Sequence, residues 1–174
     1  AEELQIDIDQ IQITATHTGK VPNTSATAAS SGSDLNGMAA RNAARTIRRR
    51  LTAFASNHYG VPETEVEFRP GRVQVGREEI SFPDLVMQAY LNRVQLSTTG
   101  FYRTPKIHYD PVTASGRPFY YFAYGAAVSE VAIDTLTGEN RVLAVDILHD
   151  VGRSLNPAID EGQIEGGFIQ GMGW

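Results

Sequence analysis

The sequence predicts an α+β fold in which mixed or antiparallel sheets pack against helices. Hairpin signatures alternate with helical stripes along the 174 residues, and neither an internal repeat nor a long linker divides them. The chain is 41% apolar and 20% charged, which is typical of a globular domain and excludes disorder over the whole length. We therefore expect residues 1–174 to form one domain or a piece of one.

The N-terminal third is predicted to contain a strand, a loop and a long helix. Residues 11–16 read IQITAT, an apolar and polar alternation typical of a strand. Residues 21–33 are mostly small and polar, which favours a loop. Ser33 or Asp34 can then cap a helix that runs to about Ser56, and the sequence Tyr59-Gly60-Val61-Pro62 ends it.

This helix places an apolar stripe on one face and arginines mostly on the other. Because single charge runs usually reflect solubility, we interpret the basic face as solvated, and the alternative is a site for a polyanion. The net charge of −5 argues against general nucleic-acid binding. The arginines concerned are Arg41, Arg45, Arg48 and Arg49.

The middle of the chain is predicted to hold a hairpin, a short helix and a strand. Residues 64–68 and 72–76 alternate on either side of a Pro-Gly pair, which indicates a hairpin. Ser81 can cap a helix that closes near Arg93, with a proline in its first turn. Another strand is expected to begin near Val94.

The C-terminal third is predicted to form an antiparallel strand pair and a helix. Residues 119–134 and 140–150 are strand-like, and Gly138 in the turn between them suits a positive φ. Asn156 followed by Pro157 marks a helix start. The glycines of this helix disfavour an exposed helix interior, so we expect something to pack closely against it.

Composition excludes several classes of protein. The chain has no cysteine, which rules out disulfides, thiolate metal sites and cysteine-ligated iron–sulfur clusters within it. It has no apolar run long enough to suggest a membrane span and no secretory signal, so we expect a cytoplasmic setting without membrane contact. It begins without Met and ends inside a patterned segment, so we expect a fragment of a longer polypeptide.

Two constellations are candidate binding sites. Residues 23–33 offer small side chains and hydroxyls before a helix N-terminus, which suits an anion such as phosphate, or they simply form a loop that enters the helix. Gln163, Gly166 and Gln170 share one helix face and suit a heterocycle rich in amide-like groups, or they serve tight helix packing. A metal cluster at residues 146–150 is disfavoured, because strand alternation turns His149 away from the two aspartates.

Four stretches carry a resemblance to one family over most of the chain. They are residues 21–40 (VPNTSATAASSGSDLNGMAA), 100–105 (GFYRTP), 119–138 (FYYFAYGAAVSEVAIDTLTG) and 146–174 (DILHDVGRSLNPAIDEGQIEGGFIQGMGW). Together they are similar to the molybdenum-cofactor-binding large subunit of the xanthine dehydrogenase and aldehyde oxidase family, and the xanthine dehydrogenase branch is closer. The resemblance implies a molybdopterin-binding domain and makes the chain a single partial domain of a longer subunit.

The resemblance assigns residues to the cofactor. Ala29, Ser30, Ser31 and Gly32 match the family segment that contacts the molybdenum and the pterin phosphate, with the Ala29 backbone nearest the metal. Gln163 matches the family glutamine that hydrogen-bonds the pterin. Relatives carry a hydroxyl where Gly32 stands, so a backbone contact is expected to replace a side-chain one there. The family's catalytic Glu lies in a Gly-Glu-Pro-Pro motif that this chain lacks, so no catalytic residue is assigned.

The resemblance also implies an activity for the complete enzyme. That activity is oxidative hydroxylation of purines of the hypoxanthine and xanthine type, with water as the oxygen source, and electrons pass through iron–sulfur clusters to FAD and then NAD. The clusters, the FAD and the remainder of the large subunit belong to other chains or regions of an enzyme expected to be a homodimer. The isolated chain is expected to be inactive. The alternative is a non-catalytic cofactor-binding remnant or an assembly module of the same fold.

Overall fold

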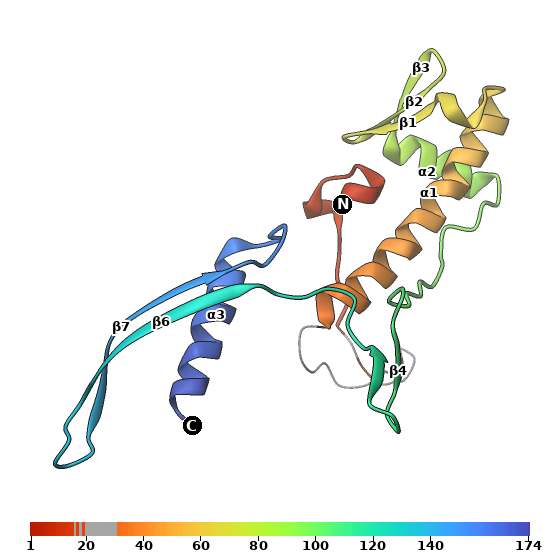
Figure 1. Ribbon diagram of the computed structural model, residues 1–174. Coiled ribbons are helices and arrows are strands. Elements are labelled where there is room, and N and C mark those ends of the chain that lie inside the picture. The colour runs from red at the N-terminus through yellow and green to blue at the C-terminus, as the bar shows by residue number, and fades with distance from the viewer. Residues whose placement is uncertain (16, 18, 20–30) are drawn as a thin grey trace. The chain divides into compact units, whose positions relative to one another are not determined.

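The computed structural model describes residues 1–15, 17, 19 and 31–174 (Figure 1). Its residues divide into two compact units, Ala1–Thr104 and Pro105–Trp174, which are described separately below. Antiparallel sheets and helices occur in the chain, so the predicted α+β class is confirmed. No helix in the described part of the chain has the length and apolar character that crossing a bilayer requires.

The main helix of the first unit begins earlier than predicted. A π-helical segment, Gly32–Gly37, continues directly into helix α1, Met38–Tyr59. Ser33 and Asp34 therefore lie inside the helical segment, and the prediction that one of them is the N-cap was wrong. The end was predicted correctly: Gly60 adopts the left-handed conformation at φ 68°, which glycine takes without steric cost.

A three-stranded antiparallel sheet follows α1. The predicted hairpin is confirmed as β1, Val66–Arg69, and β2, Arg72–Val75, in a register that places Phe68 opposite Val73. A third strand, β3 (Glu78–Ser81), pairs with β2 and was not predicted. It begins with two glutamates, which are depleted in strands, so its composition gives a weak strand signal.

Helix α2, Phe82–Leu91, begins after Ser81 as predicted. The Ser81 hydroxyl accepts a hydrogen bond from the Asp84 backbone N–H at 3.1 Å, which confirms Ser81 as the N-cap. The strand expected near Val94 was wrong, because residues 92–107 form no strand. Burial still alternates from Val94 onward, as it does in extended chain.

The first unit has a small apolar core. Helix α1, the sheet and α2 each contribute side chains to it, since each has one apolar face. The buried residues are Leu51 and Ala55 of α1, Phe68, Val73 and Val75 of the sheet, and Leu85 and Ala89 of α2. This core holds the C-terminal half of α1 in place.

The N-terminal segment is not a strand where the structure describes it. It forms two 3-10 helices, Glu2–Leu4 and Ile8–Gln10, and residues 11–15 have no regular structure. The strand predicted over residues 11–16 was therefore wrong for residues 11–15. No described strand pairs with residues 11–15 in a ladder, and a strand depends on such a partner.

The second unit consists of two hairpins and a helix. A short hairpin pairs β4, His108–Asp110, with β5, Ser115–Arg117, and was not predicted. The long ribbon pairs β6, Gly125–Ile133, with β7, Asn140–His149, as predicted, and Gly138 in its turn has φ 79°. The first strand was predicted from residue 119, but residues 119–124 form no strand. Helix α3, Pro157–Met172, begins after Asn156 as predicted, although no side-chain capping bond forms there. None of the residues 105–174 is buried.

Candidate functional site

The predicted cofactor loop is described only at its C-terminal end. Ala29 and Ser30 lie outside the described residues, whereas Ser31 and Gly32 are half-buried at the start of the helical segment. The Ser31 carbonyl accepts a hydrogen bond from the Leu35 N–H at 2.9 Å, so the loop enters the helix directly. The first N–H groups of such a helix have no intrahelical partner and attract anions.

The basic face of α1 holds the N-terminal 3-10 helix. The Glu3 carboxylate accepts hydrogen bonds from Arg41 Nε at 2.5 Å and Arg45 Nε at 3.0 Å. Arg48 donates to the Glu3 carbonyl at 3.2 Å. The hydrogen bond from Arg41 is the largest of the effects that lower the pKa of Glu3 below 4.5. Arg41 and Arg45 stay about half exposed, so this face is solvated as interpreted, and it also binds Glu3, which was not predicted.

The predicted amide face of α3 is open. Gln163 and Gln170 are exposed. A Cβ built on Gly162, Gly166 or Gly167 would meet nothing within 4 Å in the described structure. The close neighbour expected for this helix is therefore absent from the described residues, and the face offers room for a flat group to approach the backbone.

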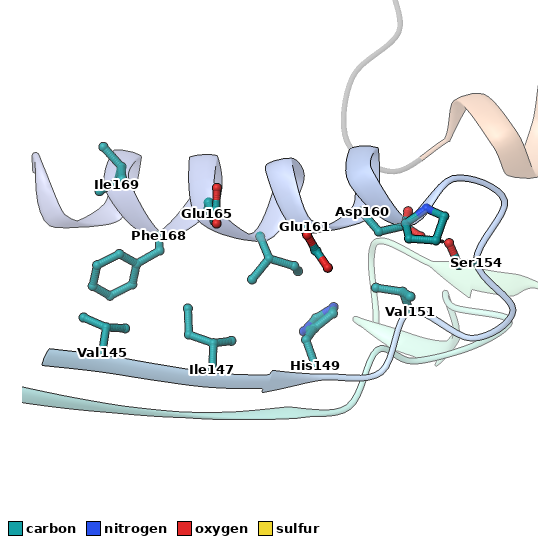
Figure 2. Close-up of a pocket in the computed structure, with 12 residues that line it drawn as sticks. Val145, Ile147, His149, Val151, Ser154, Asp160, Glu161, Glu165, Phe168 and Ile169 are labelled. Carbon is teal, nitrogen blue, oxygen red and sulfur yellow. Dashed lines mark hydrogen bonds between the residues drawn. The ribbon is translucent and has the colours of Figure 1, made fainter.

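A groove lies on the other side of α3, between the helix and β7, and has a volume of about 660 Å³. Figure 2 shows Phe168 and Glu161 of α3 pointing toward the strand, where Val145, Ile147 and His149 face them. The groove is apolar at the Phe168 end and polar at the His149 end. The sequence analysis did not predict this groove. The helical spacing of Glu161 and Phe168 and the alternation along β7 were the signals that could have indicated it.

The end of β7 forms a turn rather than a metal centre. The Asp150 carboxylate accepts the Gly152 N–H at 2.8 Å, which caps this turn. The Ser154 hydroxyl donates to the Asp160 carboxylate at the start of α3. Among the described residues, no group of three His, Asp or Glu side chains gathers where it could hold a metal ion.

The assigned cofactor residues fall in both units. Ser31 and Gly32 belong to the first unit and Gln163 to the second, at an exposed position on α3. Each part presents a feature suited to a polar, flat ligand: a helix start in one and an open amide face in the other. The structure describes the two parts separately.

Comparison with known proteins identifies the family. A family model described as "Molybdopterin cofactor-binding domain" matches residues 1–174. The chain belongs to this family. It is 47% identical over 176 residues to a xanthine dehydrogenase of Oryza sativa and 48% identical over 170 residues to a xanthine dehydrogenase/oxidase of Mus musculus. These matches cover 100% and 98% of the chain but only 11% of each relative, so the resemblance stated from sequence is confirmed for one segment of such enzymes.

A solved structure agrees with this membership. The chain is similar to a Cu,Mo-CO dehydrogenase in its carbon monoxide reduced state, with a TM-score of 0.73 and 25% sequence identity. The match covers 95% of the chain and 20% of that protein. The fold therefore recurs as one part of a larger molybdenum-containing oxidoreductase.

Proposed function

We propose that the chain is a segment of a xanthine dehydrogenase-type molybdenum hydroxylase and that its role is to bind the molybdopterin. The observation that carries the proposal is the family match over all 174 residues, together with identities of 47% and 48% to xanthine dehydrogenases. Because the chain spans about 11% of those relatives, the activity belongs to the full subunit. Residues 1–174 would then form a single partial cofactor-binding domain.

The loop that enters the first helix is proposed to hold the metal end and the phosphate of the cofactor. Ala29, Ser30, Ser31 and Gly32 would supply backbone N–H groups and hydroxyls, and the Ala29 backbone would be the part that faces the molybdenum. The half-buried helix start at Gly32 supports this assignment, since the positive end of a helix dipole favours a phosphate. Small residues in the loop let a ligand reach the main chain.

Gln163 is proposed to hydrogen-bond the pterin ring. Its exposed position on α3 and the open space over Gly166 and Gly167 fit a flat heterocycle with amide-like donors and acceptors. When bound, the molybdopterin supplies the redox chemistry for hydroxylation of a purine with water. The residues of this chain bind and orient it. No described residue of the chain is assigned as a proton carrier, in keeping with the expected catalytic Glu on another segment.

The remaining electron path is proposed to lie on other regions. The chain has no cysteine, so it provides no thiolate for an iron–sulfur cluster. We propose that a subunit or domain carrying FAD and iron–sulfur clusters accepts the electrons, with the remainder of the large subunit completing the active site of a homodimeric enzyme. The cytoplasmic setting stays a prediction.

The test is molybdenum content in the full-length enzyme. Gln163→Ala should lower molybdenum and pterin per subunit because it removes a hydrogen bond to the cofactor, about 1–3 kcal/mol when the partner is buried. Glu165→Ala, on the groove side of the same helix, is the matched control and should retain wild-type content. A bulky replacement, Ala29→Phe, should lower content by occlusion.

Unchanged molybdenum in both Gln163→Ala and Ala29→Phe would contradict the site assignment. Wild-type enzyme that contains molybdenum and oxidises xanthine supports the proposed activity. An enzyme that binds the cofactor but oxidises no purine would favour the alternative of a non-catalytic remnant or assembly module.

A further inference from the structure

An extended segment, residues 94–101, lies along helix α1 and is called the strap below. It follows α2 and runs back beside α1 (Figure 1). Val94 and Leu96 pack against the buried core of the first unit, whereas Gln95 between them and Ser97 after them are exposed. The strap therefore has the alternation of a strand, yet no described strand pairs with it.

Side chains of α1 take the place of the missing partner strand. Arg50 Nη1 donates hydrogen bonds to the carbonyls of Gln95 and Ser97, each at 3.0 Å. These carbonyls are two residues apart and so lie on one edge of extended chain. Two turns nearer the helix start, Asn42 Nδ2 donates to the Phe101 carbonyl at 2.8 Å. The strap is thus attached to α1 at both ends.

Gly100 brings the two backbones into contact. A Cβ at this position would lie 2.9 Å from the Ala39 carbonyl carbon and 2.9 Å from the Ala43 nitrogen, and it would overlap the Ala39 carbonyl oxygen. Any side chain here must push the strap away from the helix. The contact therefore requires glycine, because there is no room for a Cβ. The backbone atoms of a helix cannot move aside as a flexible side chain can.

We infer that the strap positions Ser31 and Gly32, at the start of the helical segment, by fixing the N-terminal half of α1, with Asn42 and Gly100 as positioning residues. Ala39 is seven residues beyond Gly32, about 10 Å along a helix. The core residues of α1, Leu51 and Ala55, lie near its other end. The strap thus contacts the half of α1 that follows Ser31 and Gly32 in the chain. This inference rests on the proposed function.

The experiment compares molybdenum release from full-length enzyme variants in denaturant below the unfolding transition. Asn42→Ala should release molybdenum about fivefold faster than wild type, the factor expected for one lost hydrogen bond. Asn92→Ala is the matched control: it loses a side-chain hydrogen bond to a backbone carbonyl, 2.9 Å to Gln88, at the end of α2. It should release molybdenum at the wild-type rate.

A second pair tests the close contact. Gly100→Ala should accelerate release more than Asn42→Ala, and Gly37→Ala, where a Cβ would meet nothing within 4 Å, should not accelerate it. If Gly100→Ala does not fold, the comparison of Asn42→Ala with Asn92→Ala still tests the inference. Equal release rates for Asn42→Ala and Asn92→Ala would overturn the inference and leave the strap a purely structural element. A wild-type enzyme without molybdenum would contradict the proposed function instead.

Discussion

The Glu3 carboxylate offers a sharp test of how the N-terminal segment is held. Glu3→Gln keeps the size of the side chain and removes the charge that Arg41 and Arg45 share. The Glu3 side chain is 19% exposed and the arginines are 48% and 47% exposed, so solvent screens both pairs. Exposed ion pairs contribute about 0.2–1 kcal/mol each, and we expect a total loss of about 1 kcal/mol.

The measurement is hydrogen exchange of the amides in residues 1–10, together with urea unfolding of the 174-residue chain. A loss of about 1 kcal/mol should raise the equilibrium constant for local opening of residues 1–10 about fivefold. Glu67→Gln is the control, because it breaks an ion pair with Arg69 within one strand, at 2.8 Å and with exposures of 63% and 47%. It should leave the exchange of residues 1–10 unchanged.

The pH dependence has a definite sign. The folded pKa of Glu3 lies below 4.5, chiefly because of the hydrogen bond from Arg41. The contribution of Glu3 to stability is therefore complete above pH 4.5 and is lost as the pH falls through the folded pKa. The difference between wild type and Glu3→Gln should shrink in that range. Equal exchange in Glu3→Gln and Glu67→Gln at neutral pH would refute the reasoning.

Two further predictions concern the first unit and use urea unfolding followed by far-UV circular dichroism. Leu51→Ala, at a fully buried position of α1, should cost about 2–5 kcal/mol. Leu91→Ala, at a position of α2 that is 70% exposed, should cost less than about 0.5 kcal/mol, and similar unfolding midpoints for the two variants would contradict the assigned core. Ser81→Ala removes the N-cap of α2 and should lower the free energy of unfolding by about 1 kcal/mol. Ser81→Gly should lower it by less, and a larger loss for glycine than for alanine would argue against capping.

Local chemistry made several elements predictable. The serine–proline start of α2 and the glycine that ends α1 at Gly60 are decided by nearby backbone groups, so the sequence alone indicates them. The ribbon of β6 and β7 was predictable because both strands are long and a turn with Gly138 joins them.

Elements that depend on distant partners were harder to predict. The alternation from Val94 correctly indicated extended chain, but the partner of that chain is the Arg50 side chain of a helix rather than a strand. The basic face of α1 was taken as solvated because nothing local links it to Glu3, 38 residues before Arg41. Charge patterns alone do not reveal such pairing.

The candidate site also has parts that local sequence predicts and parts that depend on distant residues. The amide face of α3 follows from helical spacing, and the structure describes it as open. The proposed role of Gln163 comes from the family resemblance, since spacing alone favoured helix packing. The groove against β7 needed the tertiary structure, because it forms only where the strand and the helix meet.

The most direct test of the central claim is elemental analysis of the full-length protein purified from its native host, with the intact mass of every chain that copurifies. The account predicts about one molybdenum for each copy of the subunit, together with chains or domains that carry iron and FAD. A full-length, folded protein without molybdenum would contradict the claim that this segment binds the molybdopterin.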